Sequence, residues 1–250
     1  MLNIIPISAF QDNYIWLIEN GSQAAIVDPG DAAPVIAALN KQGLKLSTIL
    51  ITHHHADHIG GVDRLIREYS PTVYAPKKEH YAFEHTAVSE GELINLPDLN
   101  LTLEAMDVGG HTLGHLAYYG ANLLFCGDTL FGGGCGRLFE GTPEQMLRSL
   151  QKIAQLPAET LVYCAHEYTE HNLQFAKSVE KNNADLNKRI LAAHATRAAG
   201  LATIPSSIGL ELATNPFLRC DSTEIRQTLA MQQADTVEVF ARLRQMRNQF

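Results

Sequence analysis

The sequence predicts an α/β protein whose sheets lie inside and whose helices lie outside, joined to a helical C-terminal domain. Up to residue 167, short apolar runs bounded by turn residues alternate with stretches of helical period, as in a layered α/β sandwich. A histidine or an aspartate follows the end of several of these runs. From about Tyr168 onward, helical patterns succeed one another with no convincing strand between them. We therefore expect a first domain over residues 1–167 and a helical domain over residues 168–250.

The expected strands come from apolar runs and alternating segments. Residues 3–8 and 13–19 are rich in Ile, Tyr and Trp, and Asn20-Gly21 is a hairpin signal before a returning strand. A second hairpin, about Gly120, joins two later strands. The expected strands are 3–8, 13–19, 24–27, 48–52, 72–75, 99–108, 116–119, 123–126 and 160–164.

Helical periodicity alternates with these strands and then dominates the C-terminal part. Residues 32–42 have an amphipathic pattern that ends at Gly43, a typical helix C-terminus. Thr142 precedes a proline and caps another helix, just after a glycine-rich loop at 132–137. The expected helices are 32–42, 62–69, 143–154, 172–178, 184–199, 221–231 and 236–249.

Composition describes an ordinary globular protein, with 46% hydrophobic and 18% charged residues in a chain of 250. The net charge of −8 argues against nucleic acid as the main partner, because phosphate backbones attract basic surfaces. The four cysteines show no paired or zinc-ribbon spacing, which favours reduced thiols in a cytoplasmic protein. The N-terminus lacks the positive region of a secretory signal, and no apolar run is long enough to span a membrane, so we expect neither.

The loop after the fourth expected strand carries the densest chemistry, with four histidines and one aspartate within six residues. It joins a strand to a helix, which is where open α/β sheets bind ligands. Neutral imidazoles and carboxylates are good ligands for Zn²⁺ and similar ions. His53 and His55 point the same way in an extended segment and can chelate one ion. Asp57 and His58 lie beyond the turn and can face a second ion.

Three further candidates follow later strands of the first domain. They are His111, Asp128 and His166. Strand ends at one edge of a sheet lie near one another, so we expect these side chains to converge with the loop at 53–58. His54 alternates away from His53 and is the weakest candidate ligand.

Several motifs resemble known families. Four features resemble the metallo-β-lactamase superfamily. They are Thr-His-x-His-x-Asp-His at 52–58, Gly-His-Thr-x-Gly-His at 110–115, Gly-Asp-Thr at 127–129 and His166. Further stretches resemble the glyoxalase II (hydroxyacylglutathione hydrolase) family, at positions 134–142, 164–169 and 215–219. The resemblance runs from Asp12 to Phe250.

The resemblance implies an αββα sandwich with an α-helical C-terminal domain and a site for two divalent metal ions. Zinc is the expected metal, although iron and manganese suit the same ligands. The implied ligands are His53, His55 and His111 for one ion, Asp57, His58 and His166 for the other, and Asp128 as the bridge. By the same resemblance His115 is not a ligand. Asp28 would orient a ligand imidazole, although an aspartate before proline also forms turns.

The implied reaction is hydrolysis of a glutathione thioester, chiefly S-D-lactoylglutathione. A hydroxide bridging the two metals, held with Asp57 and Asp128 at the catalytic centre, would attack the thioester carbonyl. The family's basic substrate contacts correspond to Arg137, Arg244 and Arg247, with Tyr168 beside them. Arg244 and Arg247 share one helix face, but basic residues near a helix C-terminus are also favoured by the helix dipole. We expect a monomer.

Two positions depart from the family. Gly109 stands where relatives usually have proline, which loosens the backbone beside a ligand loop. Phe139 stands in the substrate-binding set where many relatives have tyrosine, so one hydroxyl contact is lost. Other functions on the same fold are a mononuclear-iron glutathione persulfide dioxygenase and a nuclease of the tRNA-maturation type. A metal-storage module without catalysis is a further alternative.

Overall fold

The computed structural model describes residues 2–250, and the chain forms two compact units. Unit 1 is the chain up to Asp107 together with Leu113–Gly127, and unit 2 is Val108–Thr112 together with Asp128–Phe250. The units interleave along the chain, so they do not test a division after residue 167, which stays a prediction. In the described part of the chain, no helix has the length and apolar character needed to cross a bilayer.

Unit 1 is built on a mixed six-stranded sheet. Its first three strands are antiparallel, and the last four, which share β3, are parallel. In spatial order the strands are β1 (Asn3–Ala9), β2 (Asn13–Glu19), β3 (Gln23–Val27), β4 (Lys45–Leu50), β5 (Thr72–Pro76) and β6 (Thr86–Val88). The short strand β6 was not predicted.

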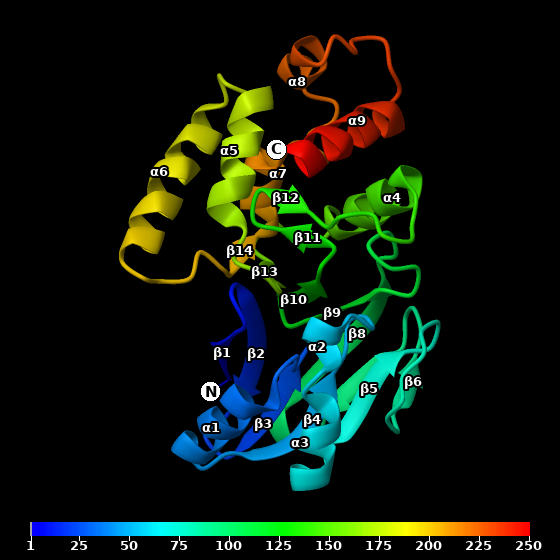
Figure 1. The fold of residues 1–250 in the computed structure, drawn as a ribbon, viewed down its shortest axis with the longest axis vertical. Helices are drawn as coiled ribbons and strands as arrows, with labels where there is room; N and C mark the ends of the chain where they lie inside the picture. Colours follow the sequence, from blue (N-terminus) through cyan, green and yellow to red (C-terminus); the bar gives the residue numbers. More distant parts are fainter. Residues whose placement is uncertain (1) are drawn as a thin grey trace. The chain divides into compact units, whose positions relative to one another are not determined.

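Helices cover one face of this sheet (Figure 1). They are α1 (Ala32–Gln42), the single turn α2 (Ala56–Ile59) and α3 (Val62–Tyr69). The predicted bounds of α1 are confirmed: the Asp31 carboxylate accepts a hydrogen bond from the Ala33 N–H, 2.8 Å, and Gly43 ends the helix with a φ of 66°. Val35, Leu39 and Leu65 are fully buried in the core between helices and sheet.

Unit 1 also contains four strands of a second, antiparallel sheet. They lie in the order β10-β9-β8-β7, with β7 (Leu93–Leu96), the 3₁₀ turn η1 (Pro97–Leu99), β8 (Leu101–Asp107), β9 (Leu116–Gly120) and β10 (Leu123–Gly127). The hairpin expected about Gly120 instead turns at Ala121 and Asn122, whose φ angles are 51° and 59°, as a two-residue hairpin turn requires. The Tyr118 hydroxyl donates to the Ile51 carbonyl, 2.5 Å, and joins β9 to the end of β4.

Unit 2 is mostly helical (Figure 1). Its elements are β11 (Leu130–Phe131), β12 (Gly134–Cys135), α4 (Pro143–Ile153), β13 (Leu161–Cys164), α5 (Thr169–Val179), α6 (Ala184–Ala198), β14 (Ser206–Ser207), α7 (Ile208–Thr214), η2 (Pro216–Leu218), α8 (Thr223–Thr228) and α9 (Thr236–Gln249). The expectation of no strand beyond Tyr168 is wrong for β14, which pairs with β13. The glycine-rich loop at 132–137 proves to be partly a hairpin, β11 with β12.

A buried polar network holds this hairpin in unit 2. The fully buried Glu211 carboxylate accepts hydrogen bonds from the Gly133 N–H, 2.9 Å, and from the Asn215 amide, 3.0 Å. Arg189 donates to the other oxygen of Glu211, 2.5 Å. The Asn215 amide also donates to the Gly134 carbonyl, 2.9 Å. Because each buried polar group finds a partner, the network holds the hairpin in one position.

Candidate metal centre and arginine pocket

The histidine-rich loop of unit 1 leaves the sheet earlier than predicted. Strand β4 ends at Leu50 instead of Thr52, and α2 begins at Ala56 after His55, whose backbone is extended. His53 Nε2 and His55 Nδ1 lie 3.1 Å apart, so the predicted pair shares one side of the segment. His54 points elsewhere, with Nδ1 3.3 Å from Glu79. The alternation expected from an extended segment is confirmed here.

Asp28 binds both the loop and a candidate ligand. Its carboxylate accepts hydrogen bonds from the Thr52 N–H, 2.8 Å, and the Thr52 hydroxyl, 2.7 Å, and lies 3.0 Å from His58 Nδ1. Ligand atoms of Asp28, His53 and His58 all lie within 4.8 Å of one another. Donation from Nδ1 of His58 to this carboxylate leaves Nε2 as the ring's electron-pair donor. Asp28 also forms the turn, with a φ of 52°.

Asn13 is a site residue that the sequence analysis missed. Its side-chain amide donates to Asp57 Oδ2, 3.0 Å, from the first position of β2, and the residue is buried. The backbone at Asp57 is also tightly packed, because a Cβ added to Gly30 would lie 1.8 Å from the Asp57 carbonyl oxygen. Nothing in the local pattern around Asn13 marks it as a partner of a residue 44 positions away.

His115 packs beside this loop, in unit 1. Its ring is fully buried and stacks on His53, with centroids 4.6 Å apart and planes at 17°. The resemblance implies that His115 is not a ligand, and its buried ring packs against the candidate ligand His53.

Unit 2 brings together the three later candidates. Asp128 directs one carboxylate oxygen to His111 Nε2, 3.4 Å, and the other to His166 Nε2, 3.3 Å. His111 Nδ1 lies 2.8 Å from the Arg137 carbonyl oxygen, which accepts a hydrogen bond from the Nδ1–H and again leaves Nε2 as the electron-pair donor. Gly136 allows the backbone of Asp128 to lie close by, since a Cβ at position 136 would be 1.9 Å from the Asp128 carbonyl oxygen.

The donor set fits divalent metal ions. In each unit, imidazole nitrogens and carboxylate oxygens face one another at 3.0–3.5 Å. Two of the rings are oriented through their other nitrogen, His58 by a carboxylate and His111 by a backbone carbonyl. Metal-binding histidines characteristically have such outer partners. Mixed imidazole and carboxylate donors suit zinc, iron and manganese alike.

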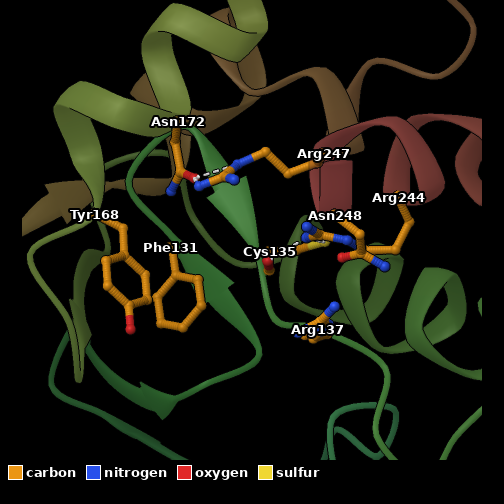
Figure 2. Close-up of a pocket in the computed structure, with 8 residues that line it drawn as sticks. All are labelled: Phe131, Cys135, Arg137, Tyr168, Asn172, Arg244, Arg247 and Asn248. Atoms are coloured by element: carbon orange, nitrogen blue, oxygen red, sulfur yellow. Dashed lines mark hydrogen bonds between the residues drawn. The ribbon is translucent and has the colours of Figure 1, made fainter. Parts of the chain in front are cut away.

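Unit 2 also contains a pocket rich in arginine (Figure 2). The residues that line it are Phe131, Cys135, Arg137, Tyr168, Asn172, Arg244, Arg247 and Asn248. None of these eight residues is acidic, so the pocket is positively charged and suits an anionic ligand. It contains four of the five residues predicted to contact substrate.

Two of the arginines come from successive turns of α9. Arg244 is buried and donates from Nη1 to the Cys135 carbonyl, 2.7 Å, while its guanidinium lies 5.0 Å from the centre of the Phe217 ring. Arg247 donates from both Nε and Nη2 to the Asn172 side-chain oxygen, 3.1 Å each. Burial, and then repulsion from Arg244, lowers the pKa of Arg247 below its ordinary value. An anionic ligand would relieve this repulsion.

The two departures from the family pattern have structural consequences. Phe139 is 61% exposed and does not line the pocket; its ring packs edge-on against His111, with centroids 5.2 Å apart. The Arg137 guanidinium lies 5.8 Å from the centre of the same ring. At Gly109, the Ser149 hydroxyl donates to the backbone carbonyl, 2.6 Å, so α4 restrains the loop that glycine would loosen.

Comparison with known proteins covers the whole chain. The family model for the hydroxyacylglutathione hydrolase C-terminus matches residues 167–250, and that for the metallo-beta-lactamase superfamily matches residues 10–166. Hydroxyacylglutathione hydrolases of Methylobacillus flagellatus and Dechloromonas aromatica are 55% and 51% identical, each over the full length of both chains.

The fold has solved counterparts. The structure of BLEG-1 B3 metallo-beta-lactamase is similar with a TM-score of 0.65 and 27% identity, over 87% of this chain and 99% of that one. These similarities confirm the predicted fold class, a metallo-β-lactamase-like α/β fold with a helical C-terminal part. The chain therefore belongs to the hydroxyacylglutathione hydrolase family, within the metallo-beta-lactamase superfamily.

Proposed function

We propose that this protein hydrolyses glutathione thioesters, chiefly S-D-lactoylglutathione, to glutathione and D-lactate. The observation that carries the proposal is the arginine pocket, which suits a ligand with carboxylates, in a chain that carries the candidate metal ligands. Relatives 46–55% identical over 97–100% of their length bear the name hydroxyacylglutathione hydrolase and support the same reaction.

We propose that the protein holds two divalent ions, zinc in the first place. The proposed ligands are His53, His55 and His111 for one ion, Asp57, His58 and His166 for the other, and Asp128 for both. The orientation of Asp128 supports this, because a carboxylate with one oxygen toward each of two imidazoles suits a shared ligand. The Asn13 amide keeps the Asp57 carboxylate in one orientation.

The chemistry that two bound divalent cations supply is activation of water and polarisation of the thioester carbonyl. Around them, Asp57 and Asp128 are the carboxylates assigned to the reacting centre, and Asp28 and the Arg137 carbonyl keep two imidazoles in the ligating tautomer. The leaving group is a thiolate whose conjugate acid has a pKa of about 8.5. It departs without a strong general acid, so none is required.

The pocket binds the glutathione part of the substrate in this proposal. Arg137, Arg244 and Arg247 face the carboxylates of the tripeptide, and Tyr168 forms part of the wall. Tyr168 also stacks on His166, with centroids 4.8 Å apart and planes at 7°, which connects the pocket to a candidate metal ligand within unit 2.

Replacing Arg244 with alanine is expected to raise KM for S-D-lactoylglutathione about tenfold or more while lowering kcat much less, because one charged hydrogen bond to substrate is lost. Steady-state kinetics on the metal-loaded enzyme measure the two constants. Arg242→Ala is the matched control, since Arg242 lies on the same helix and is exposed. An unchanged KM in Arg244→Ala would remove Arg244 from the substrate site.

The proposed activity is tested by following the thioester absorbance of S-D-lactoylglutathione with purified protein. The assay is run as isolated, after chelation, and after adding zinc, iron or manganese. Turnover that chelation abolishes and a metal restores supports the proposal and identifies the working ion. A folded, metal-loaded protein that leaves the thioester intact but consumes oxygen with glutathione persulfide would instead be a dioxygenase.

We also propose that the protein is a cytoplasmic monomer that acts on a small molecule, without nucleic acid or membrane as partner. The four cysteines, all buried thiols, support a reducing compartment. The acidic net charge of −8 counts against a nuclease. Light scattering coupled to gel filtration measures the mass, for which a monomer of 27.5 kDa is expected.

A further inference from the structure

Asn172 is a buried, uncharged residue of the arginine pocket that bonds to two of its other parts. It lies on α5 and is 4% exposed, and its side chain is bonded at both ends. The side-chain oxygen accepts from Nε and Nη2 of Arg247, 3.1 Å each, as Figure 2 shows. The amide nitrogen donates to the Gly132 carbonyl, 3.1 Å, in the hairpin that carries Phe131 and Cys135. One buried side chain thus ties α9 to the pocket wall.

The acceptor in this contact carries no charge. A guanidinium can also donate two hydrogen bonds to a carboxylate, which forms a bidentate ion pair. Here the acceptor is a neutral amide, and none of the pocket-lining residues is acidic. The contact engages Nε and Nη2, so Nη1 of Arg247 is left to other acceptors. Asn172 orients the guanidinium without cancelling its charge.

The surrounding charges favour a neutral partner. Arg137 and Arg244 line the same pocket, and repulsion from Arg244 adds to burial in lowering the pKa of Arg247. Three positive groups close together are stabilised by any anion that enters. An aspartate at position 172 would provide that anion permanently and compete with a ligand carboxylate.

We propose that Asn172 is a positioning residue for substrate binding: it aims the Arg247 guanidinium and leaves its full charge for a carboxylate of the substrate. This inference rests on the proposed function, since glutathione thioesters supply that carboxylate. In this proposal one amide orients the Arg247 guanidinium and preserves the positive charge with which the pocket binds anions. Its effect falls on binding and leaves the hydrolytic step unchanged.

The test compares two replacements of similar size. Asn172→Asp adds a negative charge beside Arg247. Asn172→Leu removes the hydrogen bonds from Arg247 without adding charge. Both lose the bond to the Gly132 carbonyl, so they differ only at Arg247: aspartate keeps an acceptor for the guanidinium and adds a charge, whereas leucine provides neither. Gln174→Glu is the control, because it adds the same charge to an exposed position of the same helix.

Two readouts are used on the metal-loaded protein. Calorimetry gives the Kd for S-methylglutathione, a thioether that cannot be hydrolysed, and kinetics give kcat and KM for S-D-lactoylglutathione and for S-lactoyl-N-acetylcysteamine, a thioester without carboxylates. We expect Asn172→Asp to raise Kd and KM for the glutathione compounds about tenfold, and more than Asn172→Leu does. We expect kcat, and all constants for the uncharged thioester, to stay within about twofold of wild type.

Equal effects of Asp and Leu at position 172, or an unchanged Kd in Asn172→Asp, would overturn the inference and leave Asn172 a structural residue. Should Asn172→Asp not fold, Arg247→Met decides, because it must weaken S-methylglutathione binding about tenfold. An unchanged Kd in Arg247→Met overturns the inference. Wild-type binding of S-methylglutathione without thioester turnover would reject the proposed function alone.

Discussion

Replacing Asp128 with alanine is expected to lower kcat/KM for S-D-lactoylglutathione by about a thousandfold, the largest effect we predict for any single side chain. The reason is the position of its carboxylate, with one oxygen 3.4 Å from His111 and the other 3.3 Å from His166. In the proposed two-metal site Asp128 is the shared ligand, so its loss would weaken both sites at once. Metal analysis after gel filtration is expected to fall from two ions per chain to one or fewer.

The control for this experiment is Asp98→Ala, which removes an exposed carboxylate from unit 1. It is expected to retain wild-type metal content and activity. Asp128→Asn tests the charge separately, because it keeps the shape of the side chain but has a single oxygen for two partners. An Asp128→Ala protein that kept both metals and more than half of its activity would exclude Asp128 as a shared ligand.

Replacing Asp28 with asparagine is expected to weaken metal binding about tenfold to a hundredfold, the usual effect of losing the outer partner of a metal-binding histidine. One carboxylate here holds both the Thr52 backbone and His58 Nδ1, so its charge stabilises the ligating tautomer of that ring. Asparagine tolerates the positive φ of 52° and still forms the turn. Competition with a chromogenic chelator measures the affinity.

Asp28→Asn separates the two interpretations of this residue. A residue that only forms the turn before Pro29 would be replaced by asparagine without loss of metal affinity. Asp28→Gly sharpens the comparison, because glycine removes the cost of the positive φ and removes the carboxylate as well. If both variants bound metal as tightly as wild type, Asp28 would be a turn residue and nothing more.

Local sequence was sufficient for elements whose own residues decide their conformation. Helix α1 has its predicted bounds because Asp31 caps its start and Gly43 is free to adopt a left-handed conformation at its end. Helix α4 likewise begins after Thr142, whose hydroxyl and Gln145 form a capping box. These signals lie within one turn of the helix end they determine.

Elements that depend on a distant partner were missed. Strands β6 and β14 have three and two residues, and each is defined by its neighbour in the sheet rather than by its own composition. Helix α7 was also missed, since its centre carries the buried acid Glu211, which interrupts the apolar pattern. That acid is buried only because Arg189 and the β11–β12 hairpin supply its partners.

The sequence by itself determined which residue types are present for chemistry and in what order: the histidines and aspartates of the proposed metal centre, the three arginines, and the family to which the chain belongs. Only the tertiary structure decided which neutral side chains orient these charged groups. Asn13 meets Asp57 across 44 positions, and Asn172 meets Arg247 across 75. A hydrogen bond depends on distance and angle in space, and the periodicity of a single sequence carries no information about either across such separations.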